Sequence, residues 1–470
     1  MTVATTGQGR AGVPTREPAA LTLRQRAGAL FPLDAEGRRV RWRIALSIAF
    51  VLAAAALSLA RQGGPGALDS IWAEDGSHYQ FTFNHGAIHT LFTPVNGYLL
   101  LVQRVVLSVI ALFPIAWAAA LMAIAGGLAS SACAVLVFHA SATLVPSRAA
   151  RLCFAVPMAI LPFGESEVGN NVVNIQWYLI YTAFWMALWN PRTRVRRALA
   201  AAVLFAAVGS DPLALAFLPL LAIRLWSRPL RESRWQLGGV AAGVLFQGIG
   251  VLRGSLDSRP PMHDYSAAFA LHGYLRYVSG TTLVSSRELA HIGLSGALAV
   301  KLLGLLAVLT LAAAALLVNR AANRPLAAIC AAFSLGFFCL VTMQGGSYND
   351  RYAVPPLLLL ITALAVLSSP ARLSSQAEAS KPAEPPHDAR WTAARACLPL
   401  AALCVLVGVN VAANYSGGSQ GRTIGPSWSS QLAAGRAACR IPGTRNAHLQ
   451  TAPVGWIVKV PCSRLLGGGR

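Results

Sequence analysis

The chain has 470 residues, of which 55% are hydrophobic and 12% are charged, and its mean hydropathy is +0.54. These values exclude an ordinary soluble domain and make lipid the expected solvent. The formal net charge of +22 would also suit nucleic-acid binding. However, the arginines lie in short clusters between long apolar runs, as in the loops of membrane proteins, so we expect no nucleic-acid partner.

The first 42 residues are polar, and no short apolar core with a cleavage site precedes Arg43. We therefore expect residues 1–42 to form a cytoplasmic tail and the first membrane helix to be retained as an anchor. Arginines cluster just before this helix, whereas the segment after it holds only Arg61 as a basic residue up to Tyr98. The positive-inside rule then places the N-terminus in the cytoplasm.

Apolar runs that can span a hydrocarbon core of about 30 Å define a membrane domain over residues 43–414. They lie at 43–60, 115–141, 151–163, 175–190, 236–253, 293–318, 325–343, 354–369 and 395–413. Residues 198–226 are too long for one span and too short for two, and the turn Gly209-Ser210-Asp211-Pro212 lies at their centre. We expect two half-length helices there, entering and leaving from the cytoplasm. The sequence thus predicts an all-α polytopic membrane protein of about eleven helical segments.

Alternation of the helices places the Arg-rich connections in the cytoplasm and four loops outside. The outer loops are 61–97, 164–175, 254–292 and 344–354. Residues 370–391, rich in Ala, Ser and Pro, are expected to form a flexible cytoplasmic linker.

Residues 415–470 are polar and are expected to form a small extracytoplasmic appendage, with a short helix at 428–438 and a strand at 456–460. Cys439 and Cys462 both lie in it, and in an oxidising compartment they are expected to pair. The other six cysteines lie in or beside apolar runs, where a free Cys behaves as a small hydrophobe.

Two adjacent acids, Glu74 and Asp75, open the first outer loop. One interpretation is a solvated loop. The other is a general base, because a partly desolvated carboxylate beside a second one has a raised proton affinity. Successive side chains of an extended loop face opposite ways, so one acid is expected to be the base while the other orients it or holds a divalent cation. Asp75 is favoured as the base because Gly76 allows a tight turn.

Polar and aromatic residues also mark the second outer loop, with Glu165 and Glu167 followed by Asn174, Gln176 and Trp177. Amides and an aromatic ring at a helix entrance suit sugar recognition. An interfacial aromatic belt with helix caps would explain Trp177 and Tyr178 well, but it explains Glu165 and Glu167 less well.

Several basic residues are candidates for anion binding. Arg351, followed by Tyr352, lies at an outer helix start, where a phosphate would also meet the helix N-terminus. Arg104, in the apolar segment 98–114, either points inward to an anion or snorkels to the interface. Lys301 and Asp211 are intramembrane candidates, although Lys301 can snorkel and Asp211 can cap a helix.

The sequence contains no Gly-rich phosphate loop, no metal-type His/Cys spacing, no nucleophile-elbow serine and no cytoplasmic domain large enough for a nucleotide sugar. A substrate must therefore be reachable from the outer face.

The chain resembles the C-type (GT-C) membrane glycosyltransferases, in an actinobacterial-type branch. The resemblance is carried by Trp72-Ala73-Glu74-Asp75-Gly76 after the first helix, Gly97-Tyr98-Leu99 with Arg104 downstream, and Arg351-Tyr352 before a late helix. It covers most of the membrane part, but the large soluble carbohydrate-binding domain of many relatives is missing.

The resemblance implies a multi-pass protein of the bacterial plasma membrane with its C-terminus outside. It implies transfer of a sugar from a polyprenyl-phosphate donor to a saccharide acceptor of the cell envelope or an exopolysaccharide. Asp75 or Glu74 would be the base, and Arg351 and Arg104 would stabilise the phosphate. Two alternatives remain open: a non-enzymatic carrier or flippase for lipid-linked saccharides, which would depend on Asp211 and Lys301, and a scaffold subunit of an envelope-synthesis complex.

Overall fold

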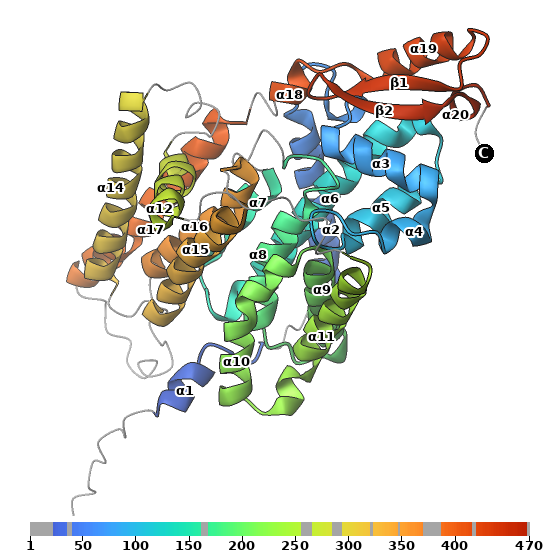
Figure 1. Ribbon diagram of the computed structural model, residues 1–470. Coiled ribbons are helices and arrows are strands. Elements are labelled where there is room, and N and C mark those ends of the chain that lie inside the picture. Colours follow the sequence, from blue (N-terminus) through green and yellow to red (C-terminus); the bar gives the residue numbers. More distant parts are fainter. Residues whose placement is uncertain are drawn as a thin grey trace, which may run out of the picture.

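The computed structural model describes residues 22–34, 40–160, 168–254, 266–283, 294–319, 323–345, 348–369, 387–415 and 420–467. The protein is predominantly helical, with one pair of strands near the C-terminal end (Figure 1). Within these ranges, six helices are long and apolar enough to cross a membrane. They are Ile115–Thr143, Leu230–Leu252, Leu298–Val318, Arg324–Met343, Asp350–Ser368 and Ala394–Ala413. The chain is therefore a helical membrane protein.

The helices follow the predicted apolar runs closely. The first half contains α1 (Leu23–Gly28), α2 (Val40–Ala60), α3 (Ala73–His85), α4 (Ala87–Leu91), α5 (Leu101–Ile110), α6 (Ala118–Ala140), α7 (Arg148–Ile160) and α8 (Ile175–Leu188). The second half contains α9 (Arg194–Ser210), α10 (Leu218–Ser227), α11 (Leu230–Leu252), α12 (Ala267–Tyr274), α14 (Leu294–Val318), α15 (Arg324–Gly345), α16 (Val354–Ser368) and α17 (His387–Ala413). The predicted linker at 370–391 lies mostly outside the described residues.

The centre of the bundle is α8, all of whose side chains are buried. It is apolar on every side, which is the pattern of a helix enclosed by other helices, and it packs against α6, α9 and α16. Its aromatic residues Trp177 and Tyr178 are 3% and 1% exposed. The interpretation of these residues as an interfacial aromatic belt is therefore wrong, because they lie inside the protein.

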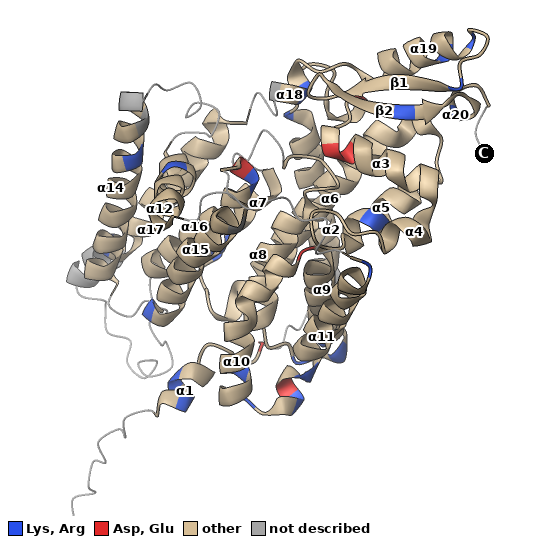
Figure 2. Ribbon diagram, in the orientation of Figure 1, with Lys and Arg blue, Asp and Glu red and all other residues tan. Residues whose placement is uncertain are grey.

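The predicted break in 198–226 is present. α9 ends at Ser210, the 3₁₀ helix η4 (Pro212–Phe217) follows, and α10 runs back. The Asp211 carboxylate caps η4 by accepting a hydrogen bond from the Leu213 N–H at 2.9 Å. At the other end, the Arg224 guanidinium donates to the carbonyl oxygen of Trp189 at 2.9 Å. The Arg-bearing ends of α9, α10 and α11 thus lie together (Figure 2).

The C-terminal segment forms α18 (Gln420–Thr423), α19 (Trp428–Cys439), the antiparallel strands β1 (Asn446–Thr451) and β2 (Trp456–Pro461), and α20 (Cys462–Leu466). It is not a separate appendage, because it is hydrogen-bonded to the segment at the start of α3. The Ala73 N–H donates to the carbonyl oxygen of Ala452 at 2.7 Å, and the Ala452 N–H donates to that of Ile71 at 2.8 Å. This contact fixes the segment against the start of α3.

Cys439 and Cys462 form a disulfide between α19 and α20, across a sequence separation of 23. The chain-entropy model assigns roughly 3 kcal/mol to a loop of this size. We expect Cys439→Ser to make residues 428–466 susceptible to limited proteolysis while the membrane helices stay intact. Cys397→Ser, at an exposed free cysteine, is the matched control. Equal protease resistance of both variants would show that the disulfide does not stabilise this segment.

Candidate functional site

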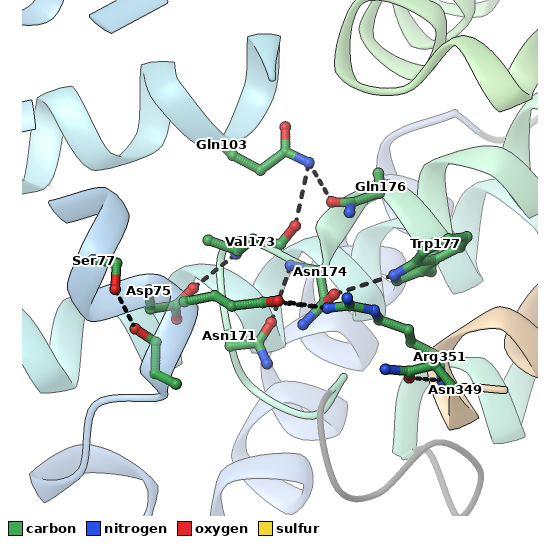
Figure 3. A network of polar contacts seen from close by, with 12 residues as sticks. Asp75, Ser77, Gln103, Asn171, Val173, Asn174, Gln176, Trp177, Asn349 and Arg351 are labelled. Atoms are coloured by element: carbon green, nitrogen blue, oxygen red, sulfur yellow. Dashed lines mark hydrogen bonds and ion pairs between the residues drawn. The ribbon is translucent and has the colours of Figure 1, made fainter. Parts of the chain in front are cut away.

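Glu74 and Asp75 lie in the first turn of α3 rather than in an extended loop. Acidic residues stabilise a helix at its N-terminus, where the backbone N–H groups are unpaired. The geometric argument from an extended loop is therefore wrong, but the two side chains still point in different directions, as neighbouring side chains of a helix do. Asp75 turns towards the segment before α8 (Figure 3). Glu74 bonds to Arg351, which lies just before α16.

Asp75 is completely buried, with 0% of the residue exposed. Its carboxylate accepts a hydrogen bond from the Val173 N–H at 2.8 Å and from the Val172 N–H at 3.0 Å. Burial raises the pKa of Asp75 to about 6, although Arg422 and the two N–H donors act in the opposite direction. An acceptor hydroxyl has no access to this carboxylate, which instead ties α3 to the segment before α8.

Arg422 of α18 is the residue that the sequence did not reveal. It is 2% exposed, and in the described part of the chain its Nε and Nη1 atoms have no hydrogen-bond partner. Burial lowers its pKa to about 10, and the charge of Asp75 acts against that shift. An arginine in a polar tail carries no sequence signal of a buried partner far earlier in the chain, so only the fold identifies this pair.

Glu74 and Arg351 form an ion pair, with both carboxylate oxygens 2.8 Å from Nη1 of Arg351. Their side chains remain 28% and 20% exposed, respectively. The side chain of Asn349 accepts a hydrogen bond from the Arg351 N–H at 3.0 Å, which caps the short helix η8 (Asp350–Ala353). The predicted acid and the predicted anion-binding arginine are thus brought together at a place that solvent reaches.

The amides at the head of α8 are buried and bonded to one another. Asn174 and Gln176 are 0% and 4% exposed. The Trp177 indole N–H donates to the Asn174 side chain at 3.1 Å, and the Gln103 amide donates to Gln176. These amides form hydrogen bonds with neighbouring side chains and stabilise the site, and they are not exposed to bind a sugar. Tyr352, half-buried, packs on Trp177 with ring centroids 5.5 Å apart, so it forms the aromatic surface beside Arg351.

Arg104 is 2% exposed and points into the protein rather than snorkelling. Its Nη1 atom lies 3.4 Å from the carbonyl oxygen of His78, and its guanidinium lies 5.2 Å from the centre of the Phe81 ring. Both contacts are on α3. Glu167, with Glu165, lies outside the described residues.

Tyr98 and Asp211 also belong to this region. Burial raises the pKa of Tyr98, and the nearby charges that act on it are those of Asp211, Arg351 and Glu74. The turn between α9 and α10 is held here, because the Ser210 hydroxyl accepts a hydrogen bond from the Val102 N–H at 3.1 Å. Arg351 therefore lies within electrostatic reach of two acids, Glu74 and Asp211.

The described residues contain no group of three His, Cys, Asp or Glu side chains that could hold a metal ion. Comparison of the chain with protein-family models, with curated proteins and with solved structures gives no match.

Proposed function

We propose that this chain is a membrane glycosyltransferase with a GT-C-like fold. It transfers a sugar from a polyprenyl-phosphate donor to a cell-envelope or exopolysaccharide acceptor on the extracytoplasmic face of the bacterial plasma membrane. The observation that carries the proposal is the partly exposed Glu74–Arg351 pair beside Tyr352. A carboxylate, a guanidinium and an aromatic ring supply a base, an anion partner and a stacking surface.

The base is Glu74 rather than Asp75, because Asp75 is enclosed and its oxygens already accept backbone N–H groups. The donor phosphate competes with Glu74 for the Arg351 guanidinium, whose fork of donors matches phosphate oxygens. Once Arg351 has turned to the phosphate, the carboxylate oxygens of Glu74 are free to accept the hydrogen of an acceptor hydroxyl.

The reaction is an inverting displacement at C1 of the sugar. Glu74 accepts the proton of the acceptor hydroxyl while the acceptor oxygen forms a bond to C1. The bond between C1 and the phosphate oxygen breaks, and its electron pair stays on the departing polyprenyl phosphate. Arg351 stabilises this added charge.

A second candidate is the carrier of lipid-linked saccharides. It is favoured by Asp211, an acid in the break between α9 and α10 that lies within electrostatic reach of Arg351. A carrier needs polar groups of this kind along its path.

The test uses purified protein in proteoliposomes with a panel of radiolabelled polyprenyl-phosphate sugars and saccharide acceptors. We expect the label to move to an acceptor with release of polyprenyl phosphate. Movement of the intact donor between leaflets, without label on any acceptor, would support the carrier and contradict the transferase.

A further inference from the structure

A groove lies between α9 and α11, far from the Glu74–Arg351 pair, and encloses about 480 Å³. It is lined by Ala201, Ala202, Phe205, Arg234, Trp235 and Gly238. The helices touch beneath it, because a Cβ atom added at Gly239 would lie 2.2 Å from the carbonyl oxygen of Ala201. At Gly238 an added Cβ would meet no atom within 4 Å. The groove thus has a floor of backbone and small residues and is open at Gly238.

The two helices run in the same direction, since Gly239 packs on Ala201 and Gly243 packs on Val208. Arg234 and Trp235 therefore lie near the N-terminal ends of α9 and α11, where the arginines cluster. At 1.5 Å per residue, Gly238 lies about 6 Å further along the axis. The groove leads from a basic mouth into an apolar channel.

The mouth carries a large excess of positive charge. Eight arginines lie between residues 192 and 234, although Arg224 is buried and Arg196 pairs with Asp34. The acids within this range are Glu232 and Asp211. Glu232 accepts a hydrogen bond from the Asn190 amide at 3.2 Å, and Asp211 lies at the opposite end of α9. Arg234 is exposed, and among the residues described here it forms no ion pair with an acid.

We propose that this groove binds one anionic phospholipid, with its phosphate at Arg234 and one acyl chain along Gly238 and Phe205. Basic clefts between membrane helices on the cytoplasmic side attract anionic head groups. Trp235, at the mouth, matches the preference of tryptophan for the boundary between head groups and hydrocarbon. An excess of arginine complements a net negative head group better than a zwitterionic one.

Native mass spectrometry of the purified full chain tests this inference, with phosphatidylglycerol and phosphatidylcholine of identical acyl chains as probes. We expect one phosphatidylglycerol to remain bound at concentrations where phosphatidylcholine is lost. Arg234→Gln should weaken that binding roughly fivefold, the effect of one basic residue near a lipid surface. Gly238→Leu should abolish it by filling the open part of the groove.

Two matched variants serve as controls. Arg395→Gln removes an exposed arginine from α17, and Gly248→Leu adds a side chain to α11 where an added Cβ also meets no atom within 4 Å. Both should bind lipid as the wild type does. Equal retention of the two lipids, or equal losses in the controls, would overturn the inference. So would a dimer that Gly238→Leu dissociates, since the groove would then hold a second copy of the chain.

Discussion

Glu74→Gln is expected to lower sugar transfer by about 10²- to 10⁴-fold, the range that a positioned general base supplies. Glutamine keeps the size of the side chain and removes its basicity. Because Glu74 and Arg351 are both partly exposed, their ion pair contributes little to stability. The variant should therefore keep the unfolding temperature of the wild type. Initial rates of label transfer at saturating donor measure the effect.

The matched control is Asp34→Asn, which breaks another acid–arginine pair at the opposite end of the molecule. Asp34 lies 2.6 Å from Arg196, so the variant loses a comparable contact and should transfer sugar normally. Sugar transfer by Glu74→Gln at the wild-type rate would contradict the assignment of Glu74 as the base. Loss of transfer in a well-folded Asp75→Asn variant, with Glu74→Gln active, would return the role to Asp75.

Asp75→Ala is expected to destabilise the fold by about 2 to 6 kcal/mol, because two buried N–H groups lose their acceptor at about 1 to 3 kcal/mol each. Asp75→Asn should lose much less stability than Asp75→Ala. The Oδ1 atom alone accepts from Val172 at 3.1 Å and from Val173 at 2.8 Å, and asparagine retains that oxygen. Thermal unfolding of the two variants in one detergent gives the comparison. Equal stability of the Ala and Asn variants would contradict the role of Asp75 as an acceptor.

The same residue makes stability depend on pH. Burial raises the pKa of Asp75 from 3.8 to about 6, and the charged groups that act on it are Arg422 and Glu74. The folded state thus binds this proton more tightly than the unfolded chain. The contribution of Asp75 to the free energy of unfolding is most favourable below about pH 4. It falls as the pH rises from about 4 to about 6 and is constant above that. The free energy of unfolding is measured against pH for the wild type and for Asp75→Asn, and the difference between the two curves gives the contribution of Asp75. Parallel curves between about pH 4 and about pH 6 would contradict the shifted pKa.

The apolar runs predict the helices well, because hydrophobic length is a local property. The break at Asp211 was also predictable, since Gly, Asp and Pro act on their own backbone. The helical form of Glu74 and Asp75 was not predicted, because α3 is short and polar and depends on β1 and β2 for its packing.

Within the candidate site, residue types were easier to predict than their roles. Arg351 stood out as an arginine beside aromatic residues, and it does meet an acid. Asn174 and Gln176 look like sugar-binding amides in the sequence, yet they are buried and bonded to other residues. The role of Arg422 could not be predicted, because its charge acts on Asp75 only after two segments far apart in the sequence have folded together.

The attachment of the last strands to α3 has a consequence for the order of folding. The Lys459 N–H of β2 bonds to Gln80 of α3, across 379 positions of sequence. During synthesis α3 is made long before β1 and β2 exist, and contacts between such distant segments form late. The face of α3 that packs on β1 and β2 is therefore left uncovered until nearly the whole chain has been made. The site is completed only then, so a ribosome that stalls in the final helices leaves a membrane bundle in which Asp75 has no Arg422 beside it and α3 has no strands to cover it.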